Sequence, residues 1–186
     1  MDINLTLSRV FFPGIILHEL SHAIACVALG VKIKKIKWIS KEGGFVIHEH
    51  NKSYKTIIIS VMPFFLNIIY AIACALLFKT NVGPILKVIL LWIGASALFF
   101  CLPSKDDSKN VFDSVKDSYT KKQSILRWLY KIILIPVTLV ILILCWIFMI
   151  LDESLLFRLL LIIFWVYLFI IWIKPLFKNH FSHHII

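Results

Sequence analysis

Residues 11–29 read FFPGIILHELSHAIACVAL, an apolar run that contains the pentapeptide His18-Glu19-Leu20-Ser21-His22. Side chains at positions i and i+4 of a helix lie on one face, so both imidazoles can reach a single metal ion, with Glu19 beside them. Ionisable groups are costly in such an apolar helix and are usually functional there. We therefore predict a metal site in a membrane-buried helix.

The composition excludes an ordinary water-soluble globule. Of the 186 residues, 60% are apolar and only 16% are charged, and the mean hydropathy is +0.91. A helix needs about 20 apolar residues to cross a hydrocarbon core of about 30 Å. We predict an all-α polytopic membrane protein with about five transmembrane helices, at roughly 7–30, 54–78, 85–102, 131–151 and 154–174.

We expect one membrane-embedded domain over residues 1–186, because the sequence contains no internal repeat and no low-complexity linker. Its core would be residues 8–115, and residues 125–175 would add a transmembrane hairpin that turns at Asp152-Glu153. These last two helices contain no recognisable chemistry. The N-terminal run carries the metal motif itself, so we expect it to stay in the mature protein rather than act as a cleaved signal.

The net charge of +10 would suggest nucleic acid as a partner in a soluble protein, but here the cations are concentrated in two connections. They are Lys32, Lys34, Lys35, Lys37, Lys41, Lys52 and Lys55 in the first, and Lys105, Lys109, Lys116, Lys121, Lys122, Arg127 and Lys131 in the second. Because basic loops face the cytoplasm, we predict an outside N-terminus, a cytoplasmic C-terminus and no nucleic-acid binding.

Local signals predict three further features. Pro13-Gly14 and Gly30 indicate a helix that starts at the proline and is capped by glycine. Residues 31–37 alternate apolar with charged side chains, and Glu42-Gly43-Gly44 supplies a turn before residues 45–47, which indicates a short β-hairpin. It could be a plain connection or a strand that holds substrate. Residues 103–124 are polar and predict a loop with a short amphipathic helix.

A catalytic zinc commonly has three protein ligands and an open position for water, whose pKa it lowers to about 7. His18 and His22 would supply two ligands, and Glu19 could take a proton from the attacking water and pass it to the leaving amine. The alternative, a histidine pair buried only for packing, would leave titratable groups in hydrocarbon without compensation. Peptide hydrolysis is the reaction that this arrangement favours.

Spacing alone does not choose the third ligand. Two carboxylates stand out, Asp106 and Asp107, because they follow a span directly and Pro103 breaks that helix. The remaining candidates are Asp113, Asp117, His48, His50, His180, His183 and His184. Cysteine ligands are not expected, since Cys26, Cys74, Cys101 and Cys145 lie in predicted spans as packing residues and form no CxxC pair.

Residues 12–31, with Phe12-Pro13-Gly14 before the pentapeptide and Leu29-Gly30-Val31 after it, resemble the first core helix of the site-2 protease-like intramembrane zinc metalloproteases. The small bacterial and archaeal branches are most similar, and they carry a Pro-Ser-x-x-Asp stretch that corresponds here to residues 103–107. The resemblance covers roughly residues 8–115. It implies a prokaryotic cell membrane as the location and an active site near the cytosolic leaflet.

The resemblance assigns roles to two further residues. It places the third zinc ligand on Asp107, following the shorter branch, because the Leu-Asp-Gly ligand motif of larger members is absent here. Residues 60–67 resemble the family's Gly-Pro-x-x-Asn helix, with Met62 in place of the glycine and the asparagine one residue later. Asn67 would then contact the substrate backbone, or else form a hydrogen bond between helices.

The predicted helices create one geometric conflict. His22 lies eight residues before Gly30, about 12 Å along the helix, whereas Asp107 lies five residues beyond the predicted end of its span. Two straight helices cannot bring these side chains together. Either the third span lies deeper in the membrane than drawn, or the chain after Pro103 turns back toward the membrane interior.

These observations predict a membrane zinc metalloprotease with His18, His22 and Asp107 as ligands and Glu19 as general base. Its partners would be the lipid bilayer and a membrane-embedded or juxtamembrane peptide substrate. A membrane binding or assembly protein with a structural or vestigial metal site is the alternative. A metal transporter is less favoured, because the spans show one ionisable cluster and no relay across the membrane.

Overall fold

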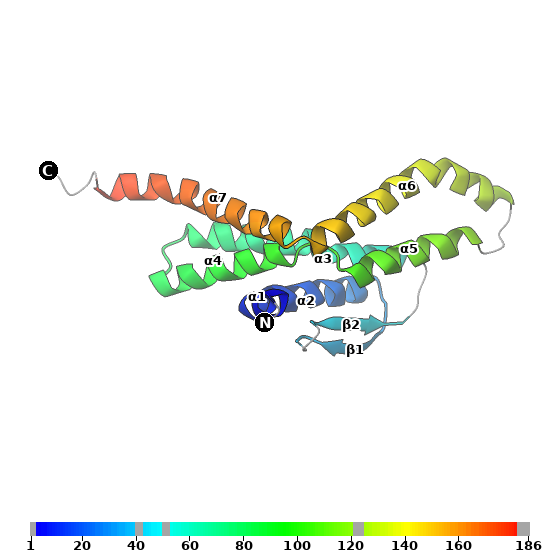
Figure 1. Ribbon diagram of the computed structural model, residues 1–186, viewed down its shortest axis with the longest axis horizontal. Coiled ribbons are helices and arrows are strands. Elements are labelled where there is room, and N and C mark those ends of the chain that lie inside the picture. The colour runs from blue at the N-terminus through cyan, green and yellow to red at the C-terminus, as the bar shows by residue number, and fades with distance from the viewer. Residues whose placement is uncertain (1–2, 40–42, 50–52, 121–124, 182–186) are drawn as a thin grey trace.

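The computed structural model describes residues 3–39, 43–49, 53–120 and 125–181. In that part of the chain it is mainly helical, with one two-stranded sheet after the motif helix (Figure 1). The elements are α1 (Ile3–Val10), α2 (Phe12–Ala28), β1 (Ile33–Lys37), β2 (Phe45–His48), α3 (Ser53–Phe78), α4 (Pro84–Phe99), α5 (Lys105–Thr120), α6 (Ile125–Glu153) and α7 (Leu155–Phe181).

Two of the five predicted spans are long and apolar enough to cross a membrane, among the residues described. They are Tyr54–Phe78 in α3 and Ile135–Glu153 in α6, and only 6% of the second is buried by protein. An apolar helix left so exposed is typical of contact with lipid rather than of the core of a soluble protein. The expectation of five full-length spans is therefore confirmed for two helices and corrected for the other three.

The other three predicted spans are shorter apolar helices: Phe12–Ala28, Pro84–Phe99 and Leu155–Leu168. The motif helix is short because the chain breaks at Phe11, between α1 and α2, where Pro13 has no N–H to donate to the carbonyl of Arg9. It ends at Ala28, and Gly30 adopts a φ of +61° while the amide of Val31 donates to the carbonyl of Cys26. This is the predicted glycine cap.

Helices α2, α3 and α4 pack against one another and form the centre of the molecule. The helices α2 and α4 approach closely at Gly14, where a side chain of even one carbon would overlap the backbone oxygen of Ser96. Small residues such as these let two membrane helices come into backbone contact. Because His18 lies one turn after Gly14, this contact also sets the position of the first histidine relative to α4.

Helices α6 and α7 meet at Ser154, next to the predicted turn, but they diverge from it instead of forming the predicted side-by-side hairpin (Figure 1). Their separate packing partners explain the difference. Helix α6 places Cys145 against Val111 and Val115 of α5, while α7 places Trp165 against the small residues of α3 and α4. The turn between α6 and α7 is held over the centre of the molecule.

The predicted β-hairpin is present as antiparallel strands β1 and β2, and α5 is the predicted amphipathic helix. Glu42, which we placed in the hairpin turn, lies outside the described residues. The hairpin contacts α2 on the side that carries Glu19, and a Cβ at Gly44 would overlap Cγ of Glu19. The absence of a side chain at Gly44 therefore lets the hairpin lie directly against the motif helix.

We expect Gly14→Ala to lower stability by about 1–3 kcal/mol, the usual range for overpacking, because the new methyl meets backbone and not a flexible side chain. Gly83→Ala is the matched control, since nothing lies within 4 Å of the position that its Cβ would occupy. Thermal unfolding in detergent micelles would compare the two variants. Equal midpoints for Gly14→Ala and the native protein would contradict the close α2–α4 contact.

Candidate metal centre

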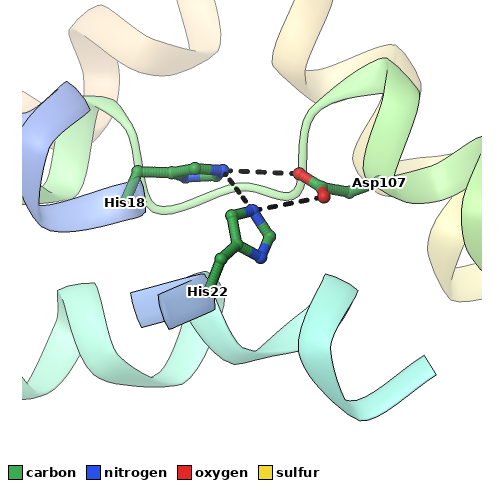
Figure 2. A group of neighbouring side chains, drawn as sticks. All are labelled: His18, His22 and Asp107. Carbon is green, nitrogen blue, oxygen red and sulfur yellow. Dashed lines mark hydrogen bonds and ion pairs between the residues drawn. The ribbon is translucent and has the colours of Figure 1, made fainter. Parts of the chain in front are cut away.

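His18 and His22 project from one face of α2 toward Asp107, near the start of α5 (Figure 2). The two Nε2 atoms lie 3.2 Å apart. Nε2 of His18 is 3.3 Å from one carboxylate oxygen of Asp107, and Nε2 of His22 is 3.2 Å from the other. All three residues are 7% exposed, so the sequence-predicted histidines and Asp107 form one buried cluster.

Backbone carbonyls fix the orientation of both imidazoles. Nδ1 of His18 lies 2.8 Å from the carbonyl oxygen of Phe100, and Nδ1 of His22 lies 2.8 Å from that of Ile59. Because a carbonyl can only accept a hydrogen bond, each Nδ1 carries the proton. Each Nε2 is then left with a lone pair that points into the cluster, as in many metal-binding histidines.

The two carbonyls are free to accept for identifiable reasons. Within a regular helix the carbonyl of Ile59 would receive the amide of residue 63, but Pro63 has no N–H. The carbonyl of Phe100 lies at the C-terminal end of α4, where the amide of Ser104 donates instead to Asp107. The proline in α3 and the end of α4 therefore each supply an acceptor for one histidine.

Asp107 is held by a capping box. Oγ of Ser104 accepts from the amide of Asp107 at 3.2 Å, and the amide of Ser104 donates to the Asp107 carboxylate at 2.9 Å. This reciprocal pair is the standard arrangement at a helix start for Ser-x-x-Asp. The hydroxyl of Ser104 also donates to the same carboxylate oxygen at 2.6 Å. The Pro-Ser-x-x-Asp stretch thus starts α5 and orients a buried carboxylate.

The early end of α4 resolves the geometric conflict raised by the sequence. Helix α4 ends at Phe99 and not near residue 102, and the carbonyl of Phe100 lies beside His18. The non-helical segment of residues 100–104 therefore begins at the depth of the motif. We considered a third span that lies deeper in the membrane and a chain that turns back after Pro103. The contact between Phe100 and His18 agrees with the first explanation.

Asp107 is ionised in this arrangement. Burial by itself raises the pKa of a carboxyl group, but the facing His22 and the hydrogen bonds from both histidines hold the pKa of Asp107 below its usual range. These hydrogen bonds require a proton on Nε2. Without that proton, two imidazole lone pairs and one carboxylate face one another with no donor between them. Such a set is electrostatically unfavourable unless a proton or a cation lies between the three groups.

The donor set and its spacing fit a small divalent cation. Zn²⁺ binds imidazole nitrogen at about 2.0–2.1 Å in tetrahedral geometry, which requires ligand atoms about 3.3–3.4 Å apart. The separations of 3.2 and 3.3 Å in the cluster are close to this value. Two imidazoles also disfavour Mg²⁺ and Ca²⁺, which prefer oxygen ligands. The group His18, His22 and Asp107 can therefore hold a transition-metal ion.

None of the other candidate ligands that the structure describes belongs to the cluster. Asp106 is exposed, and Asp113 and Asp117 lie further along α5, beyond Asp107. His48 is on β2, where its Nδ1 contacts the carbonyl of Glu49. His50, His183 and His184 lie outside the described residues, and His180 is at a helical position whose side chain is not described. The four cysteines are buried and unpaired, as expected of packing residues.

Asn67 is fully buried between helices. Its Nδ2 donates to the carbonyl of Phe100 at 2.8 Å, and its Oδ1 accepts from Ser21 at 3.5 Å. Of the two roles considered for Asn67, a substrate contact or a hydrogen bond between helices, the structure contains the hydrogen bond between helices. His18 donates to the same carbonyl of Phe100. Asn67 therefore helps to hold this carbonyl in place, and the carbonyl in turn orients His18.

A cavity of about 1160 Å³ adjoins the cluster, slightly above the usual range of about 300–1,000 Å³ for ligand sites. Its wall includes Glu19 beside both histidines, and the hairpin contributes Gly44 and its neighbours. The cavity is large enough for a short length of extended peptide. Glu19, which is 6% exposed, faces this space from the same helix as the two imidazoles.

Two charged residues in the cavity wall, Asp152 and Arg158, were not among the residues predicted from the sequence. They lie at the turn between α6 and α7, in the pair of helices that we expected to carry no chemistry. One signal could have identified them: Arg158 is a charged residue inside an apolar run, and such residues usually face protein or water. Their pairing across the turn, six residues apart, could not be predicted from spacing alone.

Comparison with known proteins agrees with this geometry. A family model described as peptidase M50B-like matches residues 12–115, which contain both histidines, Asp107 and the helices that hold them. This confirms the resemblance of the sequence to the site-2 protease-like group. No curated protein and no solved structure matches the chain at a significant level. With more than half of its length matched, the chain belongs to the peptidase M50B-like family.

Proposed function

We propose that this protein is a membrane zinc metalloprotease that hydrolyses peptide bonds of membrane-embedded or juxtamembrane substrates. The observation that carries the proposal is the convergence of two imidazole Nε2 atoms and one carboxylate, with each Nδ1 turned away toward a backbone carbonyl. Membership of a peptidase family supports the same reaction class. The proposed ligands are His18, His22 and Asp107, and the proposed general base is Glu19.

Zinc is the proposed ion because it suits two imidazoles, one carboxylate and a tetrahedral spacing, with a fourth position open. When bound, it supplies Lewis acidity toward the scissile carbonyl and makes the attacking water acidic enough to ionise near neutral pH. The protein's own contribution is to fix the tautomer that turns each Nε2 toward the metal position and to orient the Asp107 carboxylate. The hydrogen bonds to Phe100 and Ile59 and the capping box at Ser104 do this.

Glu19 is proposed to move the proton. It follows His18 directly on α2 and lines the cavity beside both histidines, so its carboxylate can accept a proton from the attacking water. The same group can then deliver that proton to the amine that leaves. Gly44 of the hairpin lies against the Glu19 side chain, which restricts its rotamers and keeps the carboxylate near the cluster.

The proposed substrate is a locally unwound peptide. In a helix each carbonyl is already bonded to the amide four residues on, so a transmembrane helix must open before its peptide bond can enter the cavity. The antiparallel hairpin beside the cavity could hold the opened segment by strand addition. The basic connections of the sequence support a cytosolic position for this site in a prokaryotic membrane.

Asp107→Asn should weaken zinc binding by more than about 100-fold, because loss of even an outer-shell partner costs about 10- to 100-fold. Asp106→Asn is the matched control: the neighbouring carboxylate is exposed and lies outside the cluster, so affinity should be unchanged. Zinc content after dialysis against graded chelator would measure both. The reverse ranking would move the ligand to Asp106.

Pro63→Ala should leave helix α3 as stable or more stable, yet weaken zinc binding by about 10- to 100-fold. The new amide at position 63 can bond to the carbonyl of Ile59, which then no longer serves only the Nδ1 proton of His22. Zinc affinity and thermal midpoint of the zinc-free protein would be measured together. Unchanged affinity would show that this carbonyl does not orient the ligand.

Glu19→Gln should retain zinc and lose cleavage by about 10²- to 10⁴-fold, the usual contribution of a general base. His22→Ala should lose both zinc and cleavage. The assay would use zinc-loaded protein in micelles with fluorescein-labelled casein and a transmembrane reporter helix as substrates. Equal cleavage by native protein and Glu19→Gln would refute Glu19 as the general base. No cleavage by the zinc-loaded native protein would refute the protease proposal and favour a binding or assembly protein with a structural metal.

A further inference from the structure

We propose that Arg158 is a substrate-positioning residue that donates hydrogen bonds to a main-chain carbonyl of the peptide bound in the cavity. The inference rests on the proposed protease function and extends it to α7, outside the residues that the family model matches. Arg158 and its partner Asp152 line the same cavity as Glu19 and the histidines. The turn between α6 and α7 thus contributes to the substrate site.

The Arg158–Asp152 pair is costly in its position. The two side chains are 18% and 17% exposed, and they form an ion pair between Nη2 of Arg158 and Oδ1 of Asp152. Replacing such a pair by apolar residues is often neutral or stabilising, so a buried pair alone is weak evidence of a structural role. By contrast, the exposed pair between Lys105 and Glu153 already ties this turn to the start of α5.

The guanidinium group is held rigidly. Its carbon lies 5.1 Å from the ring centre of Phe99 and 5.5 Å from that of Phe100, so it is stacked against the end of α4. The carbonyl of Phe100 accepts from Nδ1 of His18. Phe100 therefore contacts both the Arg158 guanidinium group, through its ring, and His18, through its carbonyl. These two contacts fix the position of Arg158 relative to the proposed reacting centre.

Arg158 also keeps unused donors. Of its guanidinium nitrogens, only Nη2 has a hydrogen-bond partner among the described residues, the Asp152 carboxylate. Nε is also unpartnered there, but it is buried beyond the reach of a bound molecule. Nη1 has no partner in the described part of the chain and is not buried, so it can donate into the cavity that Arg158 lines. Native structures usually satisfy such donors with protein, water or ligand, and we assign the Nη1 donor to the incoming peptide.

Charge favours a neutral acceptor. Asp152 already neutralises Arg158, so a second carboxylate from an acidic side chain would bring an uncompensated negative charge into a largely buried place. A main-chain carbonyl adds no charge and accepts the same N–H groups. Every unwound peptide offers such carbonyls, so the contact would hold substrates of differing sequence in one register against the cluster.

The test measures binding separately from cleavage. Zinc-loaded Glu19→Gln protein would be titrated into two fluorescein-labelled, end-blocked peptides of glycine and apolar residues, one neutral and one with a single glutamate, using fluorescence anisotropy. Arg158→Lys in the same background keeps the charge and the partner but loses the planar fork of donors. Both peptides should then bind about 10- to 100-fold more weakly, with unchanged zinc content.

Glu153→Gln is the matched control, because it breaks the exposed pair at the same turn and should leave affinity unchanged. Equal affinity of Arg158→Lys and its parent would overturn the inference, as would a loss confined to the acidic peptide. If the parent Glu19→Gln protein bound neither peptide, the proposed function itself would fail. The two failures are therefore distinguishable.

Asp152→Asn provides a second, independent variant. It leaves Arg158 with all its donors but without neutralisation, so the acidic peptide should now bind about tenfold better than the neutral one. Native-like zinc content would show that the variant is folded. No change in preference between the two peptides would contradict the assignment of a neutral acceptor to Arg158.

Discussion

Two helix carbonyls that lack their helical partners determine the geometry of the metal cluster. Pro63 leaves the carbonyl of Ile59 free inside α3, and the end of α4 leaves the carbonyl of Phe100 free. Each accepts the Nδ1 proton of one histidine at 2.8 Å. In an apolar environment a carbonyl without a hydrogen-bond donor is unfavourable. The two histidine hydrogen bonds therefore stabilise the packing of α2 against α3 and against the end of α4.

The end of α4 also explains why Asp107 lies at the same depth as the two histidines. Once α4 has ended, the amide of Ser104 is available to the Asp107 carboxylate, and the capping box starts α5 beside the histidines. The backbone polar groups of Phe100 and Ser104 are then satisfied by His18, Asn67 and Asp107 rather than by lipid or water. Irregular chain at membrane depth is tolerated where protein covers it in this way.

The sequence predicted the parts of the site that depend on local spacing. The i, i+4 histidines and the glycine cap at Gly30 each follow from fewer than six neighbouring residues, whereas Asp107 was placed in the site by the family resemblance. The depth at which α4 ends did not follow, because hydropathy continues past Phe99 and the contact of the Phe100 carbonyl with His18 joins residues far apart in the sequence. Helix lengths were overestimated for the same reason, and the ion pair at Arg158 depends on the path of a turn that local pattern does not encode.

A metal ion in the cluster would couple its binding to the arrangement of the whole centre. The three acceptors come from α2 and α5, and with both Nε2 atoms unprotonated their mutual repulsion opposes the packing of these helices until a cation lies between them. The cation would then act as a cross-link between the motif helix and the chain that leaves α4. Since Phe100 supports His18 on one side and the Arg158 guanidinium on the other, tightening this link would also fix the cavity wall at which we place the substrate.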